Sequence, residues 1–491
     1  MDLKKVLFIK RLGLLGLTSV VNALMSIILI PIFTKGKPLE DYGLWVQITV
    51  SLSLVSGLTC LGLPYTLVRY IAGEKDKNKI KEAVYSIFFV VLIVNATLSP
   101  LFAYLIFKYF GGNELEIIPK IIPIFAILLF IHALSMVGWN YLRAMQRIKK
   151  TSLLTIVQNL LVTIGVGYAI TNDYGIYGAI LALFSVSLLM LIILFYEIIS
   201  DLGLYKPKFI YLREFLKFGL PTIPSNFSAW IVSSSDRYLI GYFLGIKYVA
   251  YYNPAYSLGC LLNFIIGPLG FLLPATLSKL YEERKIDEVR LYLKYLLKYY
   301  LMIAIPAVFG ISILAKPILT ILSTQEIAEN SHLIVPFIST SIMLFGIYTI
   351  TFQILILKKR TDIAARTWII AAILNFFLNI VFIPKFGIIG AATTTLIAYV
   401  FTVAVIVKYS LKMLAINLKM SDILKSLTSA LIMSLLLQLL PMDIEEIYGI
   451  ILTIILGSMT YFAFLLILRG FTKREVKYVI SLIKKVLGTN I

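Results

Sequence analysis

The first four hundred residues of this chain carry the same landmarks twice, in the same order. The paired segments are Leu63-Pro64 and Leu273-Pro274, Tyr174-Gly-Ile-Tyr-Gly-Ala179 and Phe386-Gly-Ile-Ile-Gly-Ala391, and Phe8-Ile-Lys10 and Phe215-Leu-Lys217. The offsets between partners are 210, 212 and 207 residues, so the spacing is almost constant. A membrane chain built as two similar halves is typical of transporters, whose substrate site lies between the halves. This repeat therefore directs the interpretation of the rest of the sequence.

Composition places the repeat in a membrane. Hydrophobic residues make up 60% of the chain, charged residues 14%, and the mean hydropathy is +0.93. Soluble domains contain about 45–50% and about 25% of these classes. Because a helix needs about 20 apolar residues to cross a bilayer, we predict an all-α integral membrane protein with about 14 transmembrane helices. No small-residue cleavage site follows the first apolar run, so we expect it to be retained as the first span.

The apolar runs predict six spans in each half of the repeat and two more after it. The predicted spans are 12–34, 41–64, 83–107, 119–142, 152–171, 176–198, 217–243, 248–277, 295–321, 333–357, 367–384, 388–408, 425–441 and 447–468. We predict a first six-helix lobe over 1–205, a second over 206–416, and a third part over 417–491. That third part holds the two extra helices and an amphipathic tail from Thr472, expected to lie on the inner leaflet.

The net charge of +20 is distributed unevenly between the two sides of the membrane. Of the 45 basic residues, 37 fall in segments on the side of the N-terminus and 7 on the other side, while Arg237 lies within a span. This split predicts a multi-pass protein of the cytoplasmic membrane with both termini in the cytoplasm. The basic surface is then expected to attract anionic lipids rather than nucleic acid.

Asp236 and Arg237 are the clearest charged residues inside a predicted span. Charged side chains in hydrocarbon are costly and usually face a bundle interior or a water-filled cavity. Asp236 lies 19 residues beyond Lys217, which is about 28 Å at helical rise and close to the outer interface. Two interpretations remain open: an ion pair that anchors the helix end, or a polar wall of the substrate cavity.

Asparagines supply a second group of cavity candidates. Asn159 and Asn375 occupy corresponding spans of the two halves, and Asn22 and Asn226 correspond to within one helical turn. Their amides can donate and accept hydrogen bonds, which suits neutral sugar hydroxyls. The alternative is that each amide bonds a neighbouring helix.

Three cations are candidates for contact with a phosphate-bearing headgroup at the inner mouth. Arg69 and Lys279 follow the paired Leu-Pro elements, and Arg143 ends the fourth span on the same side. A lipid headgroup that enters from the inner leaflet would meet these side chains first. Ordinary flanking of spans by basic residues is the alternative for each of them.

Prolines in the seventh and eighth spans predict places where helices bend. Pro221 and Pro224 are expected to interrupt span 7, and Pro268 and Pro274 to interrupt span 8. Each proline removes a backbone hydrogen bond. Bent helices in the second half would fit alternating access.

Catalytic and metal-binding patterns are missing from the sequence. Cys60 and Cys260 lie in apolar runs, and His132 and His332 have no metal-ligand spacing around them, so we expect no metal and no cofactor. There is no GxxxxGK[ST] and no HExxH motif. We therefore expect a protein that is not an enzyme.

Several segments together resemble the polysaccharide transporter family of the MOP exporter superfamily, which includes O-antigen and other repeat-unit flippases. The segments are Phe215-Leu-Lys-Phe-Gly-Leu-Pro221, Ser235-Asp-Arg-Tyr-Leu-Ile-Gly-Tyr-Phe-Leu-Gly245, Val249-Ala-Tyr-Tyr252, Pro254-Ala-Tyr-Ser257, the two Leu-Pro elements and the two Gly-Ile-x-Gly-Ala turns. The resemblance implies two lobes in a V around a partly cationic central cavity. It also implies that the lobes rock to move a lipid-linked oligosaccharide to the outer leaflet, with an apolar groove for the lipid tail at the two extra helices.

The resemblance also implies the partners and the competing functions. The expected substrate is a polyprenyl-(pyro)phosphate-linked glycan, and glycosyltransferases of the same pathway are further expected partners. The first alternative is a multidrug or metabolite exporter of the same fold, although span 1 lacks the carboxylate that the multidrug branch uses for cation coupling. Less favoured alternatives are a membrane glycosyltransferase and a scaffold without transport activity.

Overall fold

A computed structural model of the chain describes residues 3–110, 117–416, 419–439 and 446–471, and all regular secondary structure in these ranges is helical. The first half contains α1 (Leu3–Thr34), α2 (Leu39–Thr59), α3 (Leu63–Ile71), α4 (Lys77–Phe110), α5 (Ile118–Ala144), α6 (Ile148–Thr171) and α7 (Gly175–Leu202). The second half contains α8 (Leu212–Gly219), the 3-10 turn η1 (Leu220–Thr222), α9 (Ile223–Phe243), α10 (Ile246–Gly259), the 3-10 turn η2 (Cys260–Leu262), α11 (Asn263–Glu282), α12 (Ile286–Ile313), α13 (Ala315–Leu322), α14 (Gln325–Ser331), α15 (Ile334–Leu357) and α16 (Thr361–Met413). Two more helices follow, α17 (Met420–Leu439) and α18 (Ile447–Ile467). The predicted amphipathic tail from Thr472 lies outside the described residues.

Eleven helices in the described ranges are long and apolar enough to cross a membrane. One of them, α16, contains two of the predicted spans, which meet at Gly387, where φ is 62° and ψ is −147°. The predicted spans 7 and 8 fall on α9 and on α10 with α11, which are not among the eleven. The all-α membrane fold is therefore confirmed, while the total of 14 spans stays a prediction.

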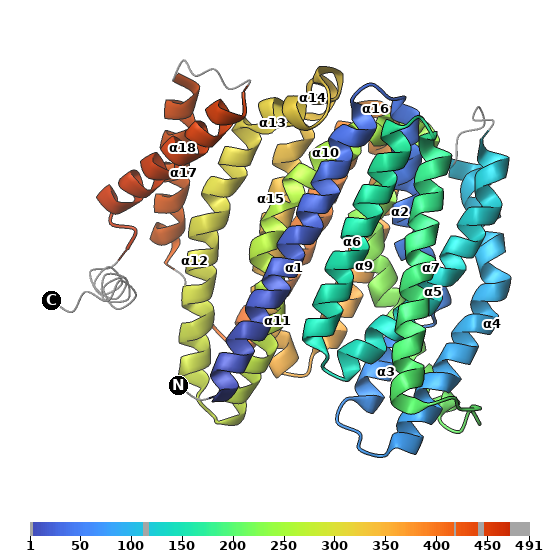
Figure 1. The fold of residues 1–491 in the computed structure, drawn as a ribbon. Coiled ribbons are helices and arrows are strands. Elements are labelled where there is room, and N and C mark those ends of the chain that lie inside the picture. Colours follow the sequence, from blue (N-terminus) through green and yellow to red (C-terminus); the bar gives the residue numbers. More distant parts are fainter. Residues whose placement is uncertain (1–2, 111–116, 417–418, 440–445, 472–491) are drawn as a thin grey trace.

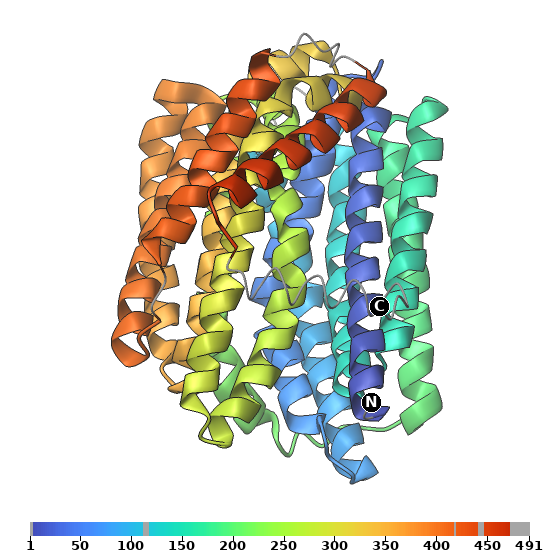
Figure 2. The ribbon, with the colours of Figure 1, turned by 90° about the vertical axis from the view of Figure 1, so that its left-hand side faces the viewer.

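The helices pack as two bundles with a flanking pair. In the first bundle α4 and α7 pack on α5, and α1 and α7 pack on α6; in the second, α15 packs against α10, α11, α12 and α16. Helices α17 and α18 pack against each other and against α12, at the edge of the molecule (Figures 1 and 2). We call the side at which α1 begins the proximal side, and the opposite side, where α13 and α14 lie, the distal side (Figure 1).

The repeated Gly-Ile-x-Gly-Ala turn has the same conformation in both halves. Gly175, which begins α7, has a φ of 61°, and Gly387 inside α16 has a φ of 62°. A residue with a Cβ rarely adopts this left-handed conformation, so glycine is required where each helix starts. The second glycine allows close approach, since a Cβ on Gly390 would lie 2.4 Å from the Phe382 carbonyl oxygen. The repeated sequence element is thus matched by a repeated turn in the structure.

The breaks in spans 7, 8 and 9 were only partly predicted. Span 7 is interrupted at η1, which contains Pro221, as expected. Span 8 is interrupted at η2 instead, and α11 continues through Pro268 and Pro274, so the expected position was wrong. Just before this break α15 passes close to the backbone of α10, since a Cβ on Gly259 would lie 2.8 Å from Ile338. The predicted span 295–321 is divided between α12 and α13.

The short helix α8 packs on the first half of the molecule although it follows the predicted boundary at 205. The Thr66 hydroxyl on α3 donates a hydrogen bond to the Phe215 carbonyl at 3.4 Å. Phe215 is buried, and the Tyr70 ring meets it edge-on at 4.9 Å. The 3-10 turn η1 therefore separates a segment held by the first lobe from α9, which packs mainly in the second.

Buried apolar residues form three clusters that differ in how they relate to the lobes. The largest joins both lobes through their distal ends and includes Phe33 and Trp45 of the first lobe and Ile240 and Tyr252 of the second. The proximal halves have separate clusters. One contains Leu63, Tyr141 and their neighbours in the first lobe, with Phe215; the other lies around Trp368 and Tyr399 in the second. The apolar core that the lobes share is thus distal, while α1 of the first lobe also packs on α11 of the second, which runs to the proximal side.

Candidate functional site

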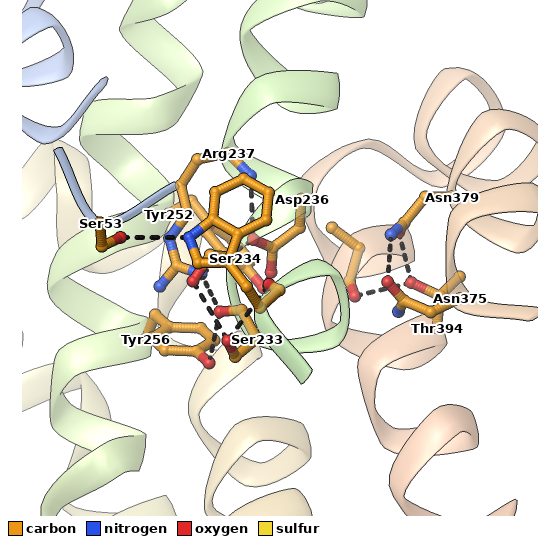
Figure 3. Close-up of polar contacts among 12 residues, drawn as sticks. Ser53, Ser233, Ser234, Asp236, Arg237, Tyr252, Tyr256, Asn375, Asn379 and Thr394 are labelled. Atoms are coloured by element: carbon orange, nitrogen blue, oxygen red, sulfur yellow. Dashed lines mark hydrogen bonds and ion pairs between the residues drawn. The ribbon is translucent and has the colours of Figure 1, made fainter. Parts of the chain in front are cut away.

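Asp236 and Arg237 form a buried ion pair in the distal half of α9. The side chains are 1% and 5% exposed, and the Arg237 Nη1 lies 2.8 Å from Asp236 Oδ1. The same Nη1 donates to the Ser233 carbonyl at 2.6 Å. In this structure the pair faces the packed interior between helices (Figure 3). Its role in a substrate cavity remains a prediction.

Two tyrosines of α10 complete the environment of this pair. The Tyr252 hydroxyl donates to Asp236 Oδ2 at 2.6 Å, and the Tyr256 hydroxyl donates to the Ser233 carbonyl at 2.9 Å (Figure 3). The guanidinium carbon of Arg237 lies 3.7 Å from the centre of the Tyr256 ring. A buried ion pair is costly unless further polar contacts support it; the Tyr252 hydroxyl and the face of the Tyr256 ring supply two such contacts, while Arg237 Nε has no hydrogen-bond partner among the described residues. Sequence reasoning quoted both tyrosines only as part of a family resemblance and assigned them no role.

The predicted asparagines divide into bonded and free groups. The Asn159 Nδ2 donates to Asn22 Oδ1 at 2.7 Å, which joins α6 to α1. The Asn379 Nδ2 donates to Asn375 Oδ1 at 3.1 Å, and the Thr394 hydroxyl donates to Asn379 (Figure 3). Asn22, Asn159 and Asn375 therefore bond other side chains within their own lobes.

Asn226 differs from the other predicted asparagines. Its side chain is exposed on α9, and within the described residues its amide has no hydrogen-bond partner. Among the four amides predicted for the cavity, this one is therefore available to a ligand in this structure.

The three predicted cations lie on the proximal side but on different helices. The Arg69 guanidinium lies over the Phe218 ring at 5.2 Å, so it connects α3 to α8. The Lys279 side chain is 77% exposed on α11 and lies 4.0 Å from a Glu283 carboxylate oxygen. Arg143 is exposed at the end of α5. The structure leaves all three accessible to solvent or headgroups.

The distal contact between the lobes is close and polar. The Asn253 Nδ2 on α10 donates to the Tyr42 hydroxyl on α2 at 3.0 Å. Deeper in the molecule, the Ser51 and Tyr238 hydroxyls lie 2.5 Å apart. At Gly43 the backbones nearly touch, because a Cβ there would lie 2.3 Å from the Ile246 carbonyl oxygen. These contacts bring α2 against α9 and α10.

Burial changes along α2 and α9 at one level of the molecule. On α2, residues 42–48 are all buried, whereas Ser53 and Gly57 are exposed. On α9, residues 235–240 are all buried, whereas Pro224 and Asn226 are exposed. The two helices meet at Ser53 and Trp230, and on the proximal side of this contact both have exposed positions. We call this the proximal interlobe surface, formed by Ser53, Gly57, Asn226, Phe227 and Trp230.

A mostly apolar cavity of about 380 Å³ lies where α17 and α18 meet the second lobe. Its walls come from α12, α13, α17 and α18, and Leu261 of η2 also contributes. The apolar residues that line it include Met302, Ile303, Pro306, Met433, Leu437 and Phe462.

Polar contacts connect the two C-terminal helices to the second lobe beside this cavity. The Tyr461 hydroxyl on α18 donates to the Met302 carbonyl of α12 at 2.7 Å. The Ser426 hydroxyl of α17 lies 2.7 Å from the same Tyr461 oxygen. Lys298 of α12 also lies 3.7 Å from the Asp422 carboxylate of α17. The pair is therefore fixed to α12.

This architecture agrees with a sequence comparison against protein families. Residues 8–276, more than half of the chain, match the family described as polysaccharide biosynthesis protein. The chain belongs to this family. Residues 221–381 also match the MatE family, so the wider expectation of a MOP superfamily flippase family is confirmed.

The similar proteins and the similar solved structure are distant from this chain in sequence. An uncharacterized membrane protein of Methanocaldococcus jannaschii (MJ1068) is 25% identical over 75% of this chain and 77% of its own length. The probable low-salt glycan biosynthesis flippase Agl15 of Haloferax volcanii is 23% identical over 47% of this chain and 49% of its own length. The structure of the lipid II flippase MurJ in an inward closed conformation superposes with a TM-score of 0.76, at 20% identity, over 94% of this chain and 99% of that one.

Proposed function

We propose that this protein moves a lipid-linked oligosaccharide from the inner to the outer leaflet of the cytoplasmic membrane by alternating access of its two lobes. The proximal side would face the cytoplasm, as both termini would, because the basic residues concentrate there. The lobes would correspond to residues 1–205 and 206–416. Such a function makes and breaks no covalent bond, which agrees with the lack of catalytic motifs.

The difference between the two ends of the lobe interface carries this proposal. The lobes share a buried core and direct hydrogen bonds distally, while proximally their apolar clusters are separate and α1 packs on α11. This arrangement is what an alternating-access protein needs in a state closed to the outside and accessible from the cytoplasm. A polar headgroup could enter between the lobes, and Arg69, Arg143 and Lys279 would meet its phosphates.

The cavity beside α17 and α18 supports a lipid-linked substrate. Its mostly apolar walls suit a hydrocarbon chain, and its position at the edge of the second lobe allows the tail to stay outside the polar path. The names of two similar proteins support the same class of substrate, since Agl15 is a probable glycan biosynthesis flippase and MurJ a lipid II flippase. We propose a polyprenyl-(pyro)phosphate carrier for the glycan.

Leaflet exchange in proteoliposomes tests the function. The probe is a polyprenyl diphosphate disaccharide with a fluorophore on the sugar, and a membrane-impermeant reductant quenches only the outward-facing molecules. We expect the protein to make the inner pool accessible to the reductant, and to leave a phospholipid with the same fluorophore on its headgroup unmoved. Equal movement of both lipids, or of neither, contradicts the proposal.

A cross-link tests whether the distal interface must open. The Tyr42→Cys/Asn253→Cys variant places thiols where the wild-type side chains are 3.0 Å apart. Joining them with a bifunctional maleimide should stop exchange, while the same variant without cross-linker should retain it. Exchange that continues after complete cross-linking would exclude distal opening as part of the mechanism.

The MatE match keeps a multidrug or metabolite exporter as the second candidate. Efflux of a cationic dye from a susceptible host that expresses the chain would favour it. Sugar-lipid exchange without dye efflux would favour the flippase.

A further inference from the structure

Two aromatic side chains of α9 lie at the level where the lobe interface changes from buried to exposed. The Trp230 Nε1 donates to the Ser53 hydroxyl of α2 at 3.1 Å, and Ser53 is itself exposed. On the distal side of this contact, Ser51 and Tyr238 are already buried. Trp230 is therefore at the innermost point of the proximal interlobe surface, and its indole is partly exposed there.

The neighbouring residues of α9 hold the Trp230 ring in a defined orientation. The planes of the Phe227 and Trp230 rings are parallel to within 3°, with centroids 6.2 Å apart. Tyr238, two turns further along α9, meets the indole at 62°, with centroids 5.7 Å apart. Because Ser53 fixes the indole nitrogen as well, the ring has little rotational freedom left to lose when a ligand packs on it.

A free amide shares the helix face with these rings. Asn226 precedes Trp230 by one helical turn, so both side chains lie on the same face of α9. The Asn226 amide is exposed and has no partner among the residues that the structure describes. It can donate and accept hydrogen bonds, and the Ser53 hydroxyl can do the same. The surface thus combines the aromatic rings of Phe227 and Trp230 with two polar side chains, Asn226 and Ser53. Both of these can form hydrogen bonds with hydroxyl groups.

The surface is neutral. The ionised groups closest along α9, Asp236 and Arg237, are buried and paired with each other. A phosphate would gain more at the exposed cations of the proximal side, for example Lys217. An apolar ring face with a few hydrogen-bonding groups suits instead a pyranose ring, whose C–H groups pack on the aromatic face while its hydroxyls bond at the edge.

We propose that Trp230, with Phe227 and Asn226, binds a neutral sugar ring of the translocated headgroup. The inference rests on the function proposed above and adds the place where the sugar is recognised. Lys217 and Trp230 are separated by 13 residues, which corresponds to about 20 Å at helical rise. The phosphates could therefore stay with the proximal cations while the glycan reaches Trp230.

Binding of two lipids to Trp230 variants tests the proposal. The probes are a polyprenyl diphosphate that carries a neutral disaccharide and the same polyprenyl diphosphate without sugar, titrated by native mass spectrometry in a detergent without a sugar headgroup. We expect Trp230→Ala to weaken binding of the sugar-bearing lipid by about tenfold, the scale of a lost aromatic contact. Binding of the sugar-free lipid should not change.

Two further variants distinguish the loss of a direct contact with the sugar from misfolding of the protein. Trp230→Phe keeps an aromatic face but loses the bond to Ser53, so it should retain most of the affinity for the sugar-bearing lipid. Tyr242→Ala removes a 60% exposed aromatic ring from the distal end of the same helix and should leave both affinities unchanged.

The outcomes distinguish this inference from the proposed function. If the wild-type protein binds neither lipid, the function proposed above is contradicted. If it binds both lipids and Trp230→Ala weakens both equally, or weakens neither, the sugar site alone is contradicted.

Discussion

The two ends of the lobe interface involve the same helices, α2 and α9, but differ in packing, hydrogen bonding and exposure. Distally, α2 meets α9 and α10 through a shared apolar core, a backbone approach at Gly43 and buried hydrogen bonds. Proximally, α2 and α9 present Ser53, Gly57 and Asn226 to solvent. The comparison indicates that closure of the lobe interface depends on specific contacts at one end of α2 and α9. The apolar character of the helices as a whole does not determine which end is closed.

Of the changes that test this difference between the two ends, disruption of the buried Asp236–Arg237 ion pair should have the largest effect, which is on protein stability. We expect Arg237→Ala to destabilise the protein by about 3–5 kcal/mol, because it leaves the Asp236 carboxylate buried without its partner. Arg69→Ala, which removes an exposed arginine at the proximal end, should change the melting temperature in detergent little. The Asp236→Ala/Arg237→Ala variant should be more stable than Arg237→Ala. Equal melting temperatures for the two arginine variants would show that the distal pair is not a structural element.

A smaller, conformational effect is expected from two glycines of the same helix. Gly43→Ala places a methyl group 2.3 Å from the Ile246 carbonyl oxygen, so α2 and α10 must separate. Gly57→Ala meets nothing within 4 Å. Both changes raise helix propensity alike, so the comparison isolates the distal contact.

Spin labels on the distal ends measure this separation. Tyr174→Cys in the first lobe and Asn330→Cys in the second are exposed positions for the labels, in a chain with Cys60 and Cys260 replaced. Gly43→Ala should lengthen the distance between them and Gly57→Ala should not. If neither variant changes the distance, the backbone approach does not control the distal closure.

The smallest effect on the distal end should come from the exposed contacts of Glu326. There Glu326 of α14 accepts a hydrogen bond from the Tyr251 hydroxyl at 2.5 Å and pairs with Lys247 at 3.1 Å. The bond from Tyr251 and then that from Lys247 hold the pKa of Glu326 below its ordinary value of 4.5. A lowered carboxylate pKa stabilises the folded contact above the ordinary value, and this contribution is lost as the pH falls through the lowered pKa.

The same pair of spin labels can detect this contribution. Acidification below pH 4.5 should broaden the distance distribution slightly, because the side chains of Lys247 and Glu326 are 44% and 54% exposed. Glu326→Gln should give the broader distribution at neutral pH and remove the pH dependence. A pH dependence that persists in Glu326→Gln would assign it to another group.

The sequence predicted those features that depend on local chemistry or on composition. Apolar runs gave the helical membrane fold, and the repeated turn gave the duplication, because Gly175 and Gly387 are needed wherever a helix must start with a positive φ. Asp236 and Arg237 were found because charges within an apolar run are rare.

Features that depend on contacts between distant segments were missed. From α10, Tyr252 donates a hydrogen bond to Asp236 and the Tyr256 ring packs on the Arg237 guanidinium, and no spacing in the sequence shows this. The break at Cys260 coincides with the approach of α15 to Gly259, a contact between distant segments that no local pattern indicates. The state of the lobe interface was also beyond prediction, since Ser51 and Ser53 look alike in sequence and only one is buried.

The hydrogen bonds of Tyr461 have a mechanical consequence for transport. Because they connect α18 and α17 to the backbone of α12, we expect the apolar cavity to move together with the second lobe. A hydrocarbon chain bound there would move together with the second lobe when the lobes rock. Its movement would then add little to the free-energy cost of the cycle. The main free-energy cost of each cycle would then be the desolvation of the phosphates and sugars. We therefore expect the turnover rate to depend on the length of the glycan rather than on the length of the tail.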